Sequence, residues 1–127
     1  MSRQVVHADQ APAAVGPYSH AIIANGFVYT AGQAALVPGT RSLKEGGIRE
    51  QTQQTLENLK AVLEAAGTSL DKVVKSNVYL VDLQDFAAMN EVYATYFPSA
   101  PPARTTVQVA ALPLGALVEI EFVALAE

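Results

Sequence analysis

The residues best suited to chemistry lie near the C-terminus, in the segment PARTTVQVAALPLGALVEIE at 102–121. One arginine, Arg104, begins a run of alternating residues, and two glutamates, Glu119 and Glu121, share one side of a second alternating run at 117–125. Such alternation is typical of half-buried strands. If these two strands lie side by side across a turn at 113–115, Arg104 comes near Glu119 or Glu121. This pair would suit the binding of a small carboxylate and the guidance of a water, or it is an ordinary salt bridge on an exposed sheet face.

Several common catalytic designs are missing from the chain. It has no cysteine, which excludes disulfides, thiolate metal sites and cysteine nucleophiles. Its two histidines, His7 and His20, are too few for a histidine-rich metal centre, so no metal is expected. No glycine-rich phosphate motif and no G-x-S-x-G motif occurs. Ser19 adjoins His20, but neighbours on a strand face opposite ways and make a poor dyad.

Length and composition favour one small domain over residues 1–127. Half of the residues are hydrophobic and only 16% are charged, which favours an oligomer that hides part of the surface. The net charge of -4 argues against nucleic-acid binding, which needs a basic surface. No apolar run has the length of a membrane span, and the N-terminus lacks the apolar core of a signal peptide. We therefore expect a soluble, cytoplasmic protein.

The order of elements predicts the architecture. Asn25-Gly26 suits the tight turn of a hairpin, Gly67 suits the end of a long helix, and Asp82 suits the start of a second helix that Pro98 stops. The predicted elements are a short edge strand at 4–7, a hairpin at 20–24 and 27–31, a helix at 48–66, a strand at 73–80, a helix from 82 to about 97, and the two C-terminal strands.

This order predicts an α+β fold with two helices on one face of a sheet. The other face needs cover, and a subunit interface that encloses polar pockets would supply it. The residues expected on that second face are Arg104, Thr106, Gln108, Glu119 and Glu121.

The segment at 102–121 closely resembles the signature of the RidA proteins (reactive intermediate deaminase A, also called YjgF or L-PSP). Similar segments follow the family order over nearly the whole chain. They are APAAVGPYS at 11–19, TAGQ at 30–33, QTQQTLENLKAVLEAAG at 51–67 and VVKSNVYLVDLQDFAAMNEVY at 73–93.

The resemblance implies a chorismate-mutase-like α+β fold, with a mixed sheet and a barrel-like homotrimer whose sites lie between subunits. It implies hydrolysis of reactive 2-enamines and 2-imines, such as 2-aminoacrylate, 2-iminopropanoate and 2-iminobutanoate, to 2-keto acids and ammonia. It implies no cofactor.

The resemblance also assigns roles to residues. Arg104 matches the arginine that binds the substrate carboxylate, for which its planar fork is suited. Glu119 matches the glutamate that orients or deprotonates the attacking water. Tyr18 matches a tyrosine at the pocket mouth, and Asn90 and Gly32 match residues that build the cleft.

Three positions depart from the family pattern. Thr106 and Ala31 both belong to the expected substrate site. Thr106 stands where relatives carry cysteine or another small residue, Ala31 stands where many relatives carry serine, and His20 stands where glutamine is common. Since none of them replaces the arginine or the glutamate, we expect them to affect substrate preference more than reaction type.

Three alternatives stay open at this stage. The small Ala31 leaves room for a larger enamine, as in a deaminase dedicated to one pathway. A ligand-binding trimer without turnover would use the same cleft. An endoribonuclease activity, a label that some relatives carry, conflicts with the acidic balance and the absence of a basic stripe.

Overall fold

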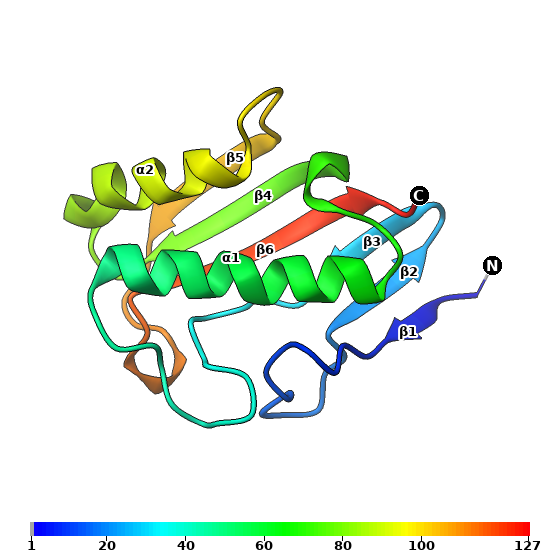
Figure 1. Ribbon diagram of the computed structural model, residues 1–127, viewed down its shortest axis with the longest axis horizontal. Coiled ribbons are helices and arrows are strands. Elements are labelled where there is room, and N and C mark those ends of the chain that lie inside the picture. Colours follow the sequence, from blue (N-terminus) through cyan, green and yellow to red (C-terminus); the bar gives the residue numbers. More distant parts are fainter. Residues whose placement is uncertain (1) are drawn as a thin grey trace.

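The computed structural model describes residues 2–127 as one six-stranded sheet with two α-helices lying across it (Figure 1). The strands occur in the order β1–β2–β3–β6–β4–β5, and every neighbouring pair is antiparallel except β4 and β5. The elements are β1 (Gln4–Val6), β2 (Ala21–Ala24), β3 (Phe27–Thr30), α1 (Ile48–Ala65), β4 (Val73–Leu80), α2 (Phe86–Tyr96), β5 (Ala103–Gln108) and β6 (Val118–Leu125). The predicted mixed sheet with two helices is confirmed.

The hairpin of β2 and β3 forms around the predicted turn. Asn25 and Gly26 have φ angles of 54° and 83°, so both central residues adopt the left-handed conformation that a type I′ turn requires. This turn sets the register in which Ala24 pairs with Phe27.

The long helix α1 ends as its sequence predicts. Gly67, with φ of 84°, follows the last turn, and its N–H donates to the carbonyl of Glu64. The N–H of Thr68 donates to the carbonyl of Leu63, which completes a Schellman motif. Leu56, Leu59 and the threonines between the apolar positions are buried against the sheet.

The second helix begins later than the sequence predicts. Asp82 does act as a cap, since its carboxylate accepts a hydrogen bond from the N–H of Gln84, but it caps a short 3₁₀ turn at Leu83–Asp85. The α-helix proper starts at Phe86. It then carries the chain from β4 to β5 as a crossover, and this is why those two strands run parallel.

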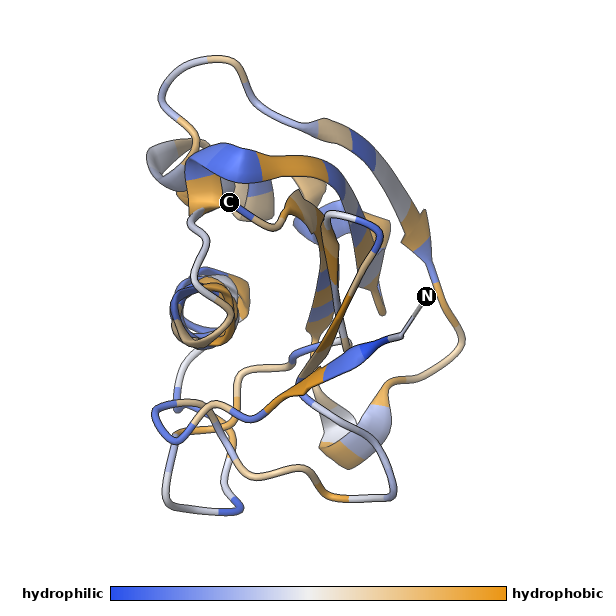
Figure 2. Cartoon of the chain, turned by 90° about the vertical axis from the view of Figure 1, so that its right-hand side faces the viewer, coloured by the Kyte–Doolittle hydropathy of each residue, from blue (hydrophilic) through white to orange (hydrophobic). Residues whose placement is uncertain are grey.

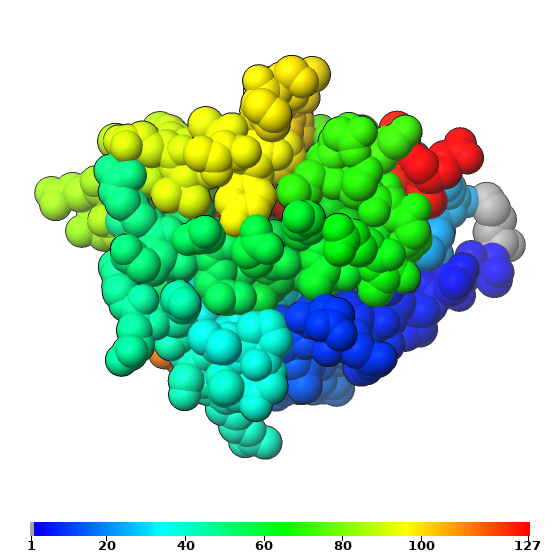
Figure 3. Space-filling view, in the orientation of Figure 1, coloured from blue at the N-terminus to red at the C-terminus, as the bar shows by residue number. Residues whose placement is uncertain are grey.

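The hydrophobic core lies between the helices and one face of the sheet. Figure 2 shows α1 end-on, to one side of the strands, and Figure 3 shows the residues of α1 and α2 covering the middle of the helix side. The largest fully buried side chains include Phe122, Ile120, Val78, Leu56 and Leu59. No helix of residues 2–127 is long and apolar enough to cross a membrane.

Val74 of β4 lies on the side of the strand opposite to the one that the sequence predicts. The alternation of β4 predicts that Val74 lies on the same side as Ser76 and Val78, but Val74 is exposed and Val73 is buried. The register between β4 and β6 shifts between Val73 and Lys75, which is the signature of a β-bulge. The extra residue turns Val74 away from the core.

The two C-terminal strands are not neighbours. β6 pairs with β3 on one side and with β4 on the other, so β5 has no access to it and pairs with β4 instead. The predicted contact of Arg104 with Glu119 or Glu121 within one chain is therefore wrong, and so is the alternative of a salt bridge between them.

The prediction of which residues lie on the open face, the side of the sheet away from the helices, is also partly wrong. Arg104, Thr106 and Gln108 pair with Ser76, Val78 and Leu80, whose side chains are buried beneath the helices. Paired residues share a face, so these three lie on the helix side. The open face carries Tyr29, Lys75, Asn77, Tyr79, Thr105, Val107, Glu119, Glu121 and Val123.

Candidate active site in two halves

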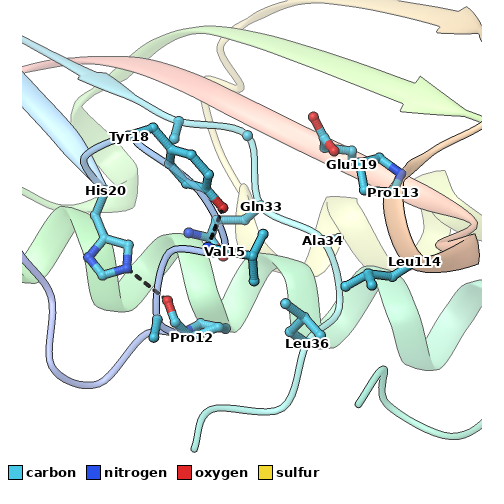
Figure 4. A pocket seen from close by; sticks show the side chains of 13 residues that line it. Pro12, Val15, Tyr18, His20, Gln33, Ala34, Leu36, Pro113, Leu114 and Glu119 are labelled. Atoms are coloured by element: carbon cyan, nitrogen blue, oxygen red, sulfur yellow. Dashed lines mark hydrogen bonds between the residues drawn. The ribbon is translucent and has the colours of Figure 1, made fainter. Parts of the chain in front are cut away.

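A cavity of about 280 Å³ collects one half of the predicted site residues (Figure 4). Tyr18, Ala31, Gly32 and Glu119 all line it, together with His20. They come from the loop before β2, the segment after β3, and β6. The sequence segments at 11–19, 30–33 and 102–121 therefore meet at this cavity.

Glu119 is held close to the backbone at Gly32. A Cβ atom at Gly32 would lie 3.0 Å from the carboxyl carbon of Glu119, so a glycine is needed for this approach. The carboxyl group is half buried, and burial is the main cause that raises its pKa above the ordinary range. The negative charge of Glu121, on the same face of β6, raises the pKa further.

Glu121 is itself fixed by Tyr79. The hydroxyl of Tyr79 donates a hydrogen bond to a carboxylate oxygen of Glu121, which, with burial, raises the pKa of Tyr79 to about 12. Tyr79 therefore keeps its proton at neutral pH. In the register of the sheet it lies directly opposite Glu119, so the carboxylate in the cavity has an ordered polar neighbourhood.

His20 shapes the wall of the cavity. Its side chain is only 3% exposed, its Nδ1 accepts a hydrogen bond of 2.9 Å from the N–H of Ala8, and its Nε2 donates one of 2.7 Å to the carbonyl of Pro12. These bonds require the neutral ring with its proton on Nε2. Further along the same loop, the hydroxyl of Tyr18 accepts a bond from the N–H of Val15. The wall of the cavity thus depends on the His20 side chain, which accepts one hydrogen bond and donates another.

Replacing His20 tests this dependence. We expect His20→Gln to keep the melting temperature near that of the wild type, because the amide oxygen can accept from Ala8 and the amide NH₂ can donate to Pro12. His20→Leu would leave both buried backbone groups unpaired, at about 1–3 kcal/mol each, and lower the melting temperature by roughly 10 °C. Thermal unfolding followed by circular dichroism measures both values. Equal melting temperatures for the two variants would contradict the assigned role.

The second half of the site surrounds Arg104. Its guanidinium lies 4.7 Å from the ring centre of Tyr93 and 5.5 Å from that of Phe86, so α2 supplies two aromatic faces for the cation. Asn90 lines the same hollow. Neither ion pair of residues 2–127 includes Arg104. Its charge is therefore available for a ligand.

Unpaired polar atoms gather around this arginine. Six buried side-chain atoms in the described part of the chain have no hydrogen-bond partner, and four of them belong to residues of this hollow or next to Arg104 in the sheet. They are Ser76 Oγ, Asn90 Oδ1, Tyr93 Oη and Thr106 Oγ1. Since buried polar groups normally find partners, those of Asn90 and Tyr93, which line the hollow, suit a polar molecule bound there.

The two halves lie on opposite faces of the sheet. Arg104 is in one row with Ser76 and Phe122, which face the helices, whereas Glu119 is in one row with Tyr79, which faces away. Within one chain, the residues predicted to act together thus form two separate hollows. Tyr18, Ala31, Gly32 and Glu119 line one, and Asn90 and Arg104 line the other. Thr106 lies on the same face of β5 as Arg104 but does not line its hollow.

Sequence reasoning missed two residues of the site, Tyr93 and Gln33. Tyr93 is a buried residue of α2, and its ring stacks on Arg104. Gln33 lines the cavity, and its N–H and carbonyl form a bridge with Ile120 that holds this segment against β6. The match of TAGQ to the family pattern is the one signal that points to Gln33.

Within residues 2–127, no group of three or more histidine, aspartate or glutamate side chains is placed to hold a metal ion.

Comparison with known proteins places the chain in a family. Residues 8–126 match the family described as Endoribonuclease L-PSP. The chain is 50% identical over 125 residues to a RutC family protein of Pyrococcus horikoshii, covering 98% of this chain and 99% of the relative. It is 47% identical over 122 residues to the 2-iminobutanoate/2-iminopropanoate deaminase of Mus musculus, covering 96% of this chain and 90% of the relative.

Solved structures agree with these relatives. The crystal structure of RidA from an Antarctic Psychrobacter bacterium has a TM-score of 0.92 and 50% identity, covering 96% of this chain and 98% of that chain. The structure of E. coli TdcF with bound serine has a TM-score of 0.91 and 37% identity, with the same two coverages. The chain therefore belongs to the RidA/YjgF/L-PSP family.

Proposed function

We propose that this protein hydrolyses 2-imino acids and their enamine forms, such as 2-iminopropanoate and 2-iminobutanoate, to 2-keto acids and ammonia. The sites lie between the subunits of a homotrimer, and each combines the Arg104 half of one subunit with the Glu119 half of its neighbour. The proposal rests on the family, on the deaminase names of relatives such as the mouse protein, and on the geometry of the two halves.

The observation that carries it is the separation of Arg104 from Glu119 by the sheet. Each hollow holds what the other lacks, because one has an unpaired cation with unpaired polar atoms and the other has a carboxylate of raised pKa. A second copy of the chain placed against the open face would bring the two kinds of hollow together. It would also cover the exposed Tyr29 and Val107.

The residues present suit the chemistry of an imine. The planar guanidinium of Arg104 binds the carboxylate of the substrate through two parallel hydrogen bonds. Glu119 takes a proton from a water whose oxygen adds to C2 and passes that proton to the imine nitrogen, so that a neutral carbinolamine forms. Glu119 then takes the proton of the hydroxyl on C2 and passes it to the nitrogen, the C–N bond breaks, C2 becomes a carbonyl carbon, and the nitrogen leaves as ammonia.

One related structure supports binding of a small amino acid in this family. TdcF was crystallised with serine, whose carboxylate lies next to a carbon that bears nitrogen, as in a 2-imino acid. The substrate proposed here has the same arrangement around a trigonal carbon.

Loss of the arginine tests the function directly. A dehydratase acting on threonine or serine generates the imine in the cuvette, and keto-acid formation is timed with and without the protein. We expect Arg104→Ala to reduce kcat/KM by about 10²–10⁴-fold, because two charged hydrogen bonds contribute roughly 1.5–3 kcal/mol each. Arg49→Ala is the control, since it removes an exposed arginine on α1 whose ion pair with Glu91 adds little stability. Unchanged turnover with Arg104→Ala would refute the proposed role.

The pH dependence should report Glu119. Its carboxylate must be ionised to take a proton, so kcat/KM falls on the acid side as Glu119 becomes protonated, at a higher pH than for an ordinary glutamate. Glu121→Gln removes the like charge that raises the pKa of Glu119, while its amide oxygen still accepts from Tyr79. We therefore expect the acid limb to move to lower pH. An acid limb that stays in place or moves to higher pH would contradict this account.

An RNA-cleaving function finds no support in the site. The rings of His7 and His20 lie 5.2 Å apart, but both ring nitrogens of His20 are engaged with backbone groups. This leaves no pair of free imidazoles to serve as acid and base. The net charge of -4 also opposes binding to a phosphate backbone.

We expect the protein to act in the cytoplasm.

A further inference from the structure

The cavity that holds Glu119 has an apolar mouth. Val15, Leu114 and Tyr18 line it, yet their side chains are 61%, 59% and 46% exposed. Leu36 adds a buried apolar wall between them (Figure 4). Large apolar side chains that gather around one opening, while remaining exposed, mark a binding surface.

Leu114 stands out among these residues. Its φ and ψ are 63° and 14°, in the left-handed region that residues other than glycine, asparagine and aspartate seldom adopt. Leu114 therefore costs free energy twice, through its backbone conformation and through the exposure of its apolar side chain to water. Neither the core nor the turn gains from a leucine at this position. An outlier of this kind, beside a carboxylate that faces the same cavity, points to function.

We propose that the aliphatic residues of this mouth and its wall, Val15, Leu36 and Leu114, bind the side chain of the substrate. The preferred substrates are then 2-imino acids with a bulky aliphatic side chain, such as the imine derived from leucine. This inference rests on the proposed deaminase function and adds the substrate class to it.

The layout of the substrate leads to this assignment. A 2-imino acid has three groups around its reacting carbon, namely the carboxylate, the nitrogen and the side chain. Arg104 of the facing half-site takes the carboxylate, and Glu119 with its water acts at the carbon. The side chain then points along the remaining wall, which includes Val15, Leu36 and Leu114. A cavity of about 280 Å³ is just below the roughly 300–1,000 Å³ seen for small-molecule sites and exceeds what a methyl or ethyl group needs.

Leu114→Asn is the most informative variant. Asparagine accepts the left-handed backbone readily, so the turn at 113–115 keeps its shape while the apolar group disappears. Val15→Ser removes a second part of the mouth from the other loop. Leu83→Asn is the matched control, because Leu83 is an exposed leucine in a short 3₁₀ turn and does not line the cavity.

The experiment compares two imines in one assay. An L-amino-acid oxidase releases them from leucine and from 2-aminobutanoate, and the added hydrolysis is measured with each protein. For the wild type we expect kcat/KM to be about ten- to a hundredfold higher with the leucine-derived imine, as burial of the extra methylene groups predicts. Leu114→Asn should reduce this ratio at least about fivefold, the double variant with Val15→Ser should reduce it further, and Leu83→Asn should leave it unchanged.

The outcomes separate this inference from the proposed function. Turnover of both imines without a preference, or a preference that Leu114→Asn does not change, overturns the side-chain site and leaves the deaminase function standing. Turnover of neither imine overturns both. Binding of 4-methyl-2-oxopentanoate and 2-oxobutanoate, measured by calorimetry, provides a readout without catalysis, and equal dissociation constants would also overturn the inference. Dissociation of Leu114→Asn into monomers would assign Leu114 to a subunit contact instead.

Discussion

Mixing Arg104→Ala subunits with Glu119→Gln subunits is expected to restore about a quarter of the wild-type activity, although each variant alone is nearly inactive. The two residues lie on opposite faces of the sheet, so the proposed site takes Arg104 from one subunit and Glu119 from another. In a random equal mixture, each interface has a one-in-two chance of receiving each intact half. Their product is the expected quarter.

The measurement uses subunits that are unfolded together, refolded together and checked for mixed assembly by a tag on one variant. A mixture of Arg104→Ala with Asn90→Ala is the control, because both residues belong to the same half and no interface is then complete. That mixture should show no more than the sum of its parts. Failure of the first mixture to exceed that sum, with mixed assemblies present, would show that the two residues do not share a site between subunits.

Gly32→Ala is expected to lower kcat by about 10²-fold without unfolding the protein. The new Cβ atom would lie 3.0 Å from the carboxyl carbon of Glu119 and 3.2 Å from its Cγ, so the glutamate must move away from its position in the cavity. A displacement of about 1 Å at a catalytic group commonly costs that much in rate. Gly32 is exposed and its backbone is not left-handed, so alanine fits the chain there.

Steady-state kinetics and thermal unfolding check this prediction together. Gly47→Ala is the control, since its Cβ atom would meet only Glu50, at an ordinary distance of 3.9 Å. If displacement of Glu119 is the cause, Gly32→Ala combined with Glu119→Gln should be no slower than Glu119→Gln alone. Additive losses in the double variant would mean that Gly32 acts in some other way.

The elements that local patterns define were predictable. The turn of Asn25 and Gly26 fixes the hairpin because both residues tolerate positive φ. Gly67 ends the long helix for the same physical reason, through the Schellman bonds that it allows. These features depend on residues a few positions apart, and a sequence displays such neighbours directly.

The pairing of the C-terminal strands was not predictable in this way. Alternation along β5 and β6 indicates which residues share a side of a strand, but it does not state which strand is the neighbour or which side faces the helices. That choice depends on the crossover through α2, which brings β5 back beside β4, and on the pairing of β6 with β3. Because only a short turn separates β5 from β6 in the sequence, the two strands were expected to pair, and this suggested the wrong neighbours, Glu119 or Glu121, for Arg104.

The sequence by itself determined the helices, the hairpin, the candidate residues and the resemblance to the RidA family, because these follow from local chemistry and from motifs that keep their order. Only the tertiary structure decided that Arg104 lies with Tyr93 and Asn90 beneath α2, while Glu119 lies with Gly32 and Tyr18 on the far side of the sheet. The physical reason is that a strand turns successive side chains to opposite faces, and only the packing of distant segments determines what each face meets.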